Sequence, residues 1–265
     1  MLRQNEFKQK LKAGQPTFGL FCSVPHPLMV ELIALADYDF VILDTEHVLV
    51  NPETLENMIR AAEALSITPL VRVGDGSKET ILRALDAGAL GVVVPHVESG
   101  AQAEAIVRAA RYYPEGMRSL NGGRPGAFGK RSLVEYMKRA NEEIMVIPMI
   151  ESRAGLEHLD EILAVPGIDL ILEGSADLSQ SFGIPWQTGS QTVQDALAHL
   201  HARCRAKGVP SCAIPRTSAE FAPLWQLGVR SFVLGDERGI SFRALNAHRT
   251  SYHQLIPTKE TVPDE

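Results

Sequence analysis

The sequence predicts an α/β protein, a single (β/α)₈ barrel of the TIM-barrel type, and three observations favour it. Apolar runs of strand length alternate with helix-length segments along the 265 residues. The connections are mostly short, and no linker separates two domains. Turn formers bound each apolar run, as they do in parallel sheets whose two faces are both covered. A doubly wound open sheet is the alternative, but the first strand lacks the Gly-rich turn typical of dinucleotide binding.

Eight strand-helix units follow one another along the chain. Asn51 and Pro52 mark the start of one helix, and Ser77 and Gly88 mark the start and end of the next. Runs rich in β-branched residues predict strands at 17–21, 39–43, 68–73, 91–94, 144–150, 168–172, 210–214 and 231–234. Helical patterns occupy 27–36, 52–65, 77–87, 101–111, 133–140, 192–207, 219–227 and 240–253. The predicted catalytic domain covers residues 1–256, and the tail at 257–265 is expected to be disordered.

Composition narrows the partners and the compartment. The net charge of -6 argues against nucleic acid or an anionic membrane as partner, because either would require a basic face. No run approaches the roughly 18 apolar residues of a membrane span, and the first residues lack a signal-peptide core, so a cytoplasmic location is expected. Cys22, Cys204 and Cys212 show no CxxC spacing and are expected to be reduced and structural.

Two carboxylates follow neighbouring predicted strands. Glu151 ends the strand at 144–150, and Asp177 follows the strand at 168–172. Parallel strands present their C-terminal ends on one side, so both carboxylates are expected at the rim where barrel enzymes do their chemistry. Carboxylate oxygens suit a divalent cation such as Mg²⁺. The alternative is that Glu151 caps the following helix and Asp177 starts a one-turn helix.

Further polar residues end the second and third strands. Asp44 and His47 form a plausible orienter and base, since a carboxylate bound to one ring nitrogen raises the basicity of the other. A capped loop with a solvated His is equally compatible with the pattern. Arg72 interrupts an apolar strand and suits bidentate capture of a substrate carboxylate. Its alternative role is an internal salt bridge to Glu46 or Glu151.

The segment at 112–130 departs from the regular alternation. It follows the fourth strand and its helix, and it contains five Gly and two Pro. A connection of this length and composition is typically functional. Arg118 and Arg124 are therefore expected to close over an anionic substrate.

Five motifs in this order resemble those of the HpcH/HpaI family of metal-dependent (class II) pyruvate aldolases. They are DTEH at 44–47, VRV at 71–73, YPEGMR at 113–118, PMIES at 148–152 and GSADLS at 174–179. The resemblance implies a (β/α)₈ barrel with a divalent metal, Mg²⁺ first and Mn²⁺ or another as alternatives, on Glu151 and Asp177. It also implies a 2-oxo acid chelated to that metal. A homo-oligomer, from dimer to hexamer, with C-terminal helices packed across subunits is implied as well.

The same resemblance implies roles for individual residues. Arg72 would contact the substrate near its oxo group, and His47 with Asp44 would be the acid-base element. Ser175 and Ala176 of the GSADLS motif would contact the substrate.

Departures from the family pattern bear on the reaction. Ser119, Met149 and Ser175 stand where Gly, Gln and Pro are usual in these aldolases. The segments 119–130, 178–186 and 234–239 resemble the citrate synthase branch of staphyloferrin-type siderophore biosynthesis. The leading hypothesis is therefore citrate synthesis from oxaloacetate and acetyl-CoA. The alternatives are a class II aldolase that cleaves 4-hydroxy-2-oxo acids to pyruvate and an aldehyde, and a non-catalytic metabolite-binding barrel.

Overall fold

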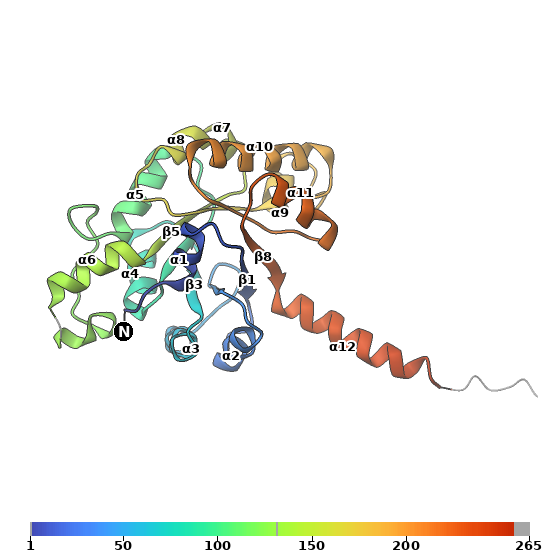
Figure 1. The fold of residues 1–265 in the computed structure, drawn as a ribbon, viewed down its shortest axis with the longest axis horizontal. Coiled ribbons are helices and arrows are strands. Elements are labelled where there is room, and N and C mark those ends of the chain that lie inside the picture. Colours follow the sequence, from blue (N-terminus) through green and yellow to red (C-terminus); the bar gives the residue numbers. More distant parts are fainter. Residues whose placement is uncertain (1, 131, 257–265) are drawn as a thin grey trace, which may run out of the picture.

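The computed structural model describes residues 2–130 and 132–256. Its parallel strands form a closed barrel in the order β1 to β8 (Figure 1), which confirms the predicted fold class. The strands are β1 (Thr17–Cys22), β2 (Phe40–Asp44), β3 (Thr68–Arg72), β4 (Gly91–Val94), β5 (Met145–Ile150), β6 (Ile171–Glu173), β7 (Ser211–Ala213) and β8 (Ser231–Asp236).

Burial of the strands on both faces explains their composition. Every residue of β2, β3, β4 and β5 is buried. Alternate side chains of one strand join different clusters: Phe40 and Ile42 pack with Leu70 in one core, whereas Val41 and Leu43 join another. This period of two directs one set into the barrel and the other toward the surrounding helices.

Helices surround the barrel, and several begin with the predicted caps. Asn51 and Ser77 accept hydrogen bonds from the first turns of their helices, and Gly88 ends the second in the left-handed conformation. The helices are α1 (Glu6–Lys12), α2 (Pro27–Leu35), α3 (Pro52–Ala64), α4 (Lys78–Ala87), α5 (Gly100–Ala110), α6 (Leu133–Glu143), α7 (Arg153–Glu157), α8 (Leu159–Leu163), α9 (Ser175–Ser181), α10 (Gln191–Lys207), α11 (Phe221–Gln226) and α12 (Glu237–His253), with 3₁₀ turns η1 (Arg124–Gly129) and η2 (Ser218–Glu220).

The sixth strand begins later than predicted because Asp169 is committed elsewhere. Its carboxylate accepts the Val146 N–H at 2.9 Å and forms ion pairs with Lys8 at 2.8 Å and Arg111 at 2.7 Å. The residues before Ile171 therefore anchor the N-terminal end of the barrel and do not extend the strand.

The N-terminal helix α1 covers that same end of the barrel. Phe7 is fully buried and stacks on Phe40 with ring centroids 4.2 Å apart. Asn5 and Lys8 donate to the carbonyls of Leu90 and Ile144, which precede β4 and β5. The strands terminate at the opposite end, where a barrel of this kind carries its substrate pocket.

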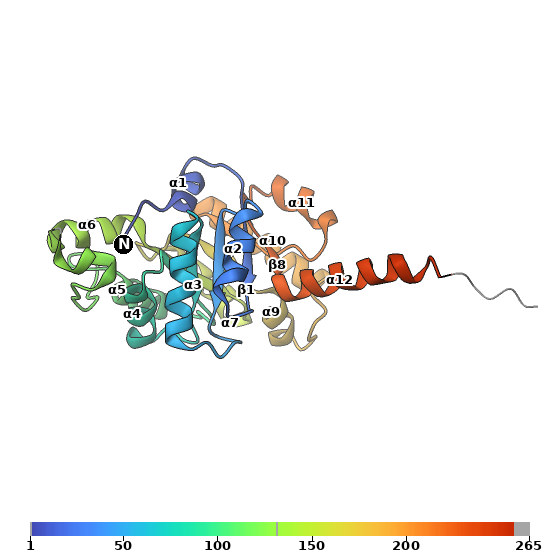
Figure 2. The ribbon, with the colours of Figure 1, turned by 90° about the horizontal axis from the view of Figure 1, so that it is seen from below.

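The C-terminal helix α12 extends away from the barrel in both views (Figures 1 and 2). Glu237 is its one buried residue. The Glu237 carboxylate accepts the N–H groups of Ser23 and Val24 and so ties the start of the helix to the end of β1. The predicted disordered tail at 257–265 lies outside the described residues.

No helix within residues 2–130 and 132–256 is long and apolar enough to cross a bilayer.

The three cysteines are buried free thiols. Burial raises the pKa of Cys22, Cys204 and Cys212 to about 12 each.

Candidate active site

The C-terminal ends of the strands enclose a pocket of about 200 Å³. It brings together most of the residues that the sequence singled out, from strands distant in the chain. Its lining includes Asp44, His47, Arg72, Glu151, Ser175, Ala176 and Asp177, with Phe21, Ser23, Met149, Gly174, Trp186, Ile214, Arg216, Gly235, Asp236 and Arg238.

Glu151 is a deeply buried carboxylate beside this pocket, and its Oε1 lies 3.4 Å from His96 Nδ1. It is 4% exposed, and its Oε1 accepts the His96 N–H at 2.8 Å. Burial raises the pKa of Glu151, and the charges of Glu46 and Asp177 add to this effect, whereas the His96 N–H opposes it. A buried carboxylate surrounded by further negative charge is stabilised by a cation.

Gly174 explains how Asp177 comes close to Glu151. A Cβ on Gly174 would overlap the Glu151 carboxylate, so only glycine lets the turn approach this closely. The Gly174 N–H also donates to the Ile150 carbonyl at 3.1 Å. The turn is thereby fixed against β5, and Asp177 enters the pocket from the first turn of α9.

These residues fit a divalent cation. Within the described chain, no group of three or more His, Cys, Asp or Glu is arranged to hold a metal. Two carboxylates with open positions for water and substrate are nevertheless the ligand set that Mg²⁺ commonly uses. The burial of Glu151 near the carboxylates of Glu46 and Asp177 favours such an ion, because these surroundings raise the pKa of Glu151 and a cation would stabilise its charged form.

Arg72 is held by two carboxylates. Its Nε and Nη2 donate to Asp44 at 3.0 and 2.8 Å, and its Nη1 lies 3.2 Å from Glu46. Burial alone would raise the pKa of Asp44, but hydrogen bonds and charge from Arg72 outweigh it and hold that pKa below its usual value. Of the two internal salt bridges considered from the sequence, to Glu46 or to Glu151, Arg72 therefore forms the one to Glu46. Because a guanidinium carries five N–H groups, Arg72 keeps donors for a ligand in the pocket.

The predicted pairing of Asp44 with His47 needs correction. Asp44 accepts the main-chain N–H groups of Glu46 and His47 at 3.1 and 3.3 Å, and its remaining capacity goes to Arg72. The His47 ring is largely exposed, and its Nε2 lies 3.7 Å from Glu46. Glu46, not Asp44, is thus the carboxylate that faces His47.

Sequence reasoning noted Glu46 but gave it no role in the site. It lies within 4 Å of Arg72, His47 and His96, so it connects three cationic or basic side chains. Arg216, which follows β7, was not among the residues that the sequence singled out. Its Nη2 donates to Ser175 Oγ at 3.1 Å, beside Asp177 in the pocket lining.

Trp186 had no sequence signal for a role in the site. It lines the pocket, is 77% exposed and has a φ of 64°. A bulky residue in this backbone conformation is unusual and tends to occur at functional sites.

The structure places Arg118 and Arg124 away from the pocket for which the sequence predicted them. Neither residue lines it. Arg118 is buried, 2.8 Å from Asp86 and over the Tyr112 ring, and Arg124 lies 2.6 Å from Glu63. The segment follows a helix, α5, and therefore lies at the N-terminal end of the barrel, opposite the strand ends that form the pocket.

We expect Arg118→Leu to lower the free energy of unfolding by about 2 kcal/mol, because the Asp86 carboxylate loses its cationic partner and the Tyr112 ring loses its contact with the guanidinium. Thermal unfolding measures the effect. The matched control is Arg83→Leu, because Arg83 forms an exposed pair with Glu79 on the same helix as Asp86, and such pairs contribute little. Equal melting temperatures for both variants would show that Arg118 does not stabilise the loop.

A buried polar chain supports the turn that carries Asp177. Glu173 accepts the Ile214 N–H at 2.7 Å, and its other oxygen lies 2.6 Å from His201 Nε2. His201 Nδ1 lies 2.9 Å from Ser211 Oγ. Glu173 is the last residue of β6 and directly precedes Gly174. These contacts with β7 and α10 therefore fix the position at which the turn begins.

Comparison with known proteins identifies the family of the chain. A model of the HpcH/HpaI aldolase/citrate lyase family matches residues 17–219. A hydroxypyruvate/pyruvate aldolase of Sagittula stellata is 35% identical over 81% of this chain and 85% of its own length. A 2-keto-3-deoxy-L-rhamnonate aldolase of Klebsiella pneumoniae is 36% identical over 78% of each chain. The crystal structure of citrate synthase SbnG superposes with a TM-score of 0.87 at 46% identity, covering 94% of this chain and 97% of that one. The chain therefore belongs to the HpcH/HpaI aldolase/citrate lyase family.

Proposed function

We propose that this chain makes citrate from oxaloacetate and acetyl-CoA, as a step in siderophore biosynthesis. The observation that carries the proposal is its 46% identity to citrate synthase SbnG over nearly the whole of both chains. Identity to the two aldolases above is 35% and 36% over a smaller share of the chain. A 2-oxo acid also suits a pocket that combines two carboxylates for a cation with Arg72.

Glu151 and Asp177 would hold the divalent cation. The cation would supply Lewis-acid polarisation of the 2-oxo group. Arg72 would donate its remaining N–H groups to the substrate near its oxo oxygen, where negative charge develops as the new bond forms. Ser175 and Ala176 would contact the substrate at the start of α9, as both line the pocket.

His47 would remove the proton. It would take a proton on Nε2 from the methyl group of the acetyl thioester, and Glu46, 3.7 Å from that nitrogen, would stabilise the imidazolium. The methylene carbon of the resulting enolate would form a bond to the 2-oxo carbon as the carbonyl π bond breaks, and the alkoxide would take up a proton from water. Water would then cleave the carbon-sulfur bond of the citryl thioester, which gives citrate and CoA.

A class II aldolase that cleaves 4-hydroxy-2-oxo acids is the second candidate, favoured by the curated aldolase relatives. One set of assays separates the two functions. The purified protein with Mg²⁺ should release free CoA thiol from acetyl-CoA only when oxaloacetate is present. Pyruvate release from 4-hydroxy-2-oxo acids without any CoA release would establish the aldolase instead, and neither product would favour a non-catalytic barrel.

We also propose a homo-oligomer in which α12 packs on a second copy of the chain. Phe242 and Leu245 on α12 are 71% and 70% exposed. The nearby barrel helix α2 buries Val30 and Ile33 but exposes Leu28, Leu32 and Leu35 by half or more. A helix apolar on both its inner and outer sides is typically buried, so α2 is expected to be covered by an apolar helix such as a partner's α12.

The double variant Phe242→Glu and Leu245→Glu should therefore convert the oligomer to monomers, because it places charges in an apolar interface. Light scattering after size exclusion measures the mass. Asn246→Glu, at an exposed position of the same helix, is the control and should keep the parental mass. A parent that is already monomeric, or a double variant of unchanged mass, would contradict this arrangement.

A further inference from the structure

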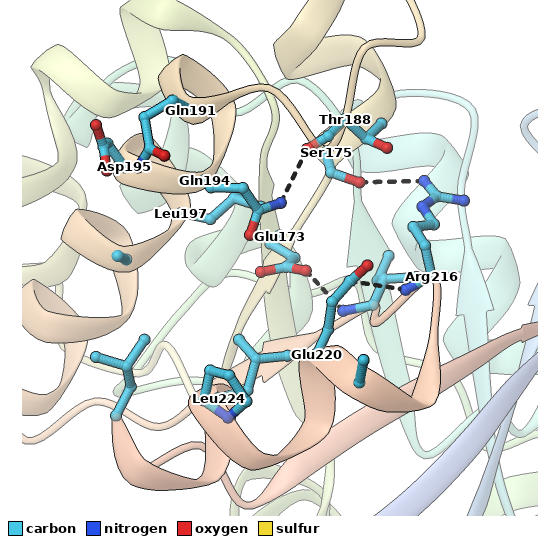
Figure 3. Close-up of a pocket in the computed structure, with 15 residues that line it drawn as sticks. Glu173, Ser175, Thr188, Gln191, Gln194, Asp195, Leu197, Arg216, Glu220 and Leu224 are labelled. Atoms are coloured by element: carbon cyan, nitrogen blue, oxygen red, sulfur yellow. Dashed lines mark hydrogen bonds between the residues drawn. The ribbon is translucent and has the colours of Figure 1, made fainter.

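A second cavity, of about 380 Å³, lies beside the catalytic pocket between α10 and the η2–α11 segment (Figure 3). Ser175, Ile214 and Arg216 line both spaces. The hydrogen bond from Arg216 Nη2 to Ser175 Oγ lies at this shared boundary. The two spaces thus adjoin at a polar junction, and the larger one has no role in the chemistry described above.

Charge in the second cavity disfavours anions. Apart from Arg216 at the junction, its ionisable lining residues are Glu173, Asp195 and Glu220. Glu220 accepts the Arg216 main-chain N–H at 2.9 Å and so stays beside the junction. Phosphate or carboxylate groups of a ligand would be repelled from the interior, and a neutral ligand segment is favoured.

The walls combine apolar and amide surfaces. Leu197 and Leu224 contribute apolar surface, and Gln191 and Gln194 contribute amide groups (Figure 3). Ala198 also lines the cavity. Gln194 Nε2 donates to the Thr188 carbonyl at 2.9 Å, which leaves its amide oxygen as an acceptor. A ligand in which methylene groups alternate with amides could place its methylene groups against the apolar side chains and bind the glutamine amides through its own amides.

We propose that this cavity binds the pantetheine arm of the acyl-CoA donor, an inference that rests on the proposed function. Pantetheine is uncharged and alternates amides with short methylene runs, and it ends in the sulfur that carries the acyl group. With the sulfur at the Ser175–Arg216 junction, the acetyl group enters the catalytic pocket. The anionic nucleotide of CoA stays outside the acidic interior. Arg216 then lies next to the thioester as it crosses between the two spaces.

Ala198→Phe tests the proposal by filling the cavity from α10. We expect the KM for acetyl-CoA to rise about tenfold or more, because the phenyl ring would occupy the space that the pantetheine arm needs. The KM for oxaloacetate should stay within about twofold of the parental value. His199→Phe is the matched control, since His199 is exposed, adjacent in the helix and absent from the cavity lining. Parental KM for acetyl-CoA in a folded Ala198→Phe would overturn the proposal.

Pantetheine itself supplies a second measurement, in case the substituted helix does not fold. On the parent enzyme it should inhibit competitively against acetyl-CoA and not against oxaloacetate. Turnover of acetyl-CoA without such inhibition would refute this site but leave the proposed function intact. If the parent releases no CoA, the proposed function fails separately. Ligand-observed NMR with pantetheine then tests the cavity directly. We expect the parent and Gln226→Trp to bind pantetheine and Leu224→Trp to lose this binding. If the parent does not bind pantetheine, the proposed site is overturned.

Discussion

Glu151→Gln should lower Mg²⁺ affinity by about 100-fold or more while leaving the melting temperature unchanged or raised. Loss of residues that merely orient metal ligands already costs about 10- to 100-fold in affinity, so loss of a ligand charge should reach at least the upper end. Stability should not fall, because burial and the nearby Glu46 and Asp177 disfavour the charged form of Glu151. Glutamine keeps the oxygen that accepts the His96 N–H.

Calorimetric titration with Mg²⁺ and thermal unfolding test this prediction together. Glu173→Gln is the matched control, because Glu173 is an equally buried carboxylate but is bonded to His201 at 2.6 Å. It should lower the melting temperature and change Mg²⁺ affinity much less. Parental Mg²⁺ affinity in Glu151→Gln would remove Glu151 from the cation site, and the same reasoning applies to Asp177→Asn.

Arg72→Lys should reduce kcat/KM for oxaloacetate on the order of 100-fold. Lysine keeps one charge but cannot bind both oxygens of Asp44 as the planar guanidinium does at 3.0 and 2.8 Å. It would also lose the guanidinium N–H groups that Asp44 and Glu46 do not use, at a position that lines the pocket.

A purely structural role for Arg72 would give a different result. Asp44→Asn weakens the same pair without removing the guanidinium from the pocket, and it serves as the comparison. If kcat/KM in both variants falls only in proportion to the fraction unfolded at the assay temperature, Arg72 is a structural residue. A much larger loss in Arg72→Lys than in Asp44→Asn, at similar melting temperatures, assigns it to the substrate.

The strands and their caps were predictable because local rules and tertiary packing agree there. Asn51 and Ser77 cap their helices as predicted, and the apolar runs became buried strands. The pattern did not reveal that residues 168–170 leave the sixth strand, because the ion pairs of Asp169 with Lys8 and Arg111 join distant parts of the chain.

The errors at the site have identifiable physical causes. Asp44 and His47 are close in sequence, but the nearest strong partner of Asp44 is Arg72 on the neighbouring strand, where β2 and β3 pair residue for residue. Arg118 and Arg124 were assigned to the substrate from composition alone. The order of elements already placed their loop after a helix, at the end of the barrel away from the strand termini.

A ¹³C NMR experiment tests most directly whether this enzyme forms a carbon-carbon bond between the acetyl methyl group and oxaloacetate. The parent enzyme would be mixed with acetyl-CoA labelled at the methyl carbon, unlabelled oxaloacetate and Mg²⁺, beside Asp177→Asn under the same conditions. We expect the label to appear in a methylene carbon of citrate with the parent and to remain in acetyl-CoA with the variant. Label found only in acetate or unreacted acetyl-CoA with the parent, while a 4-hydroxy-2-oxo acid is cleaved to pyruvate, would contradict it.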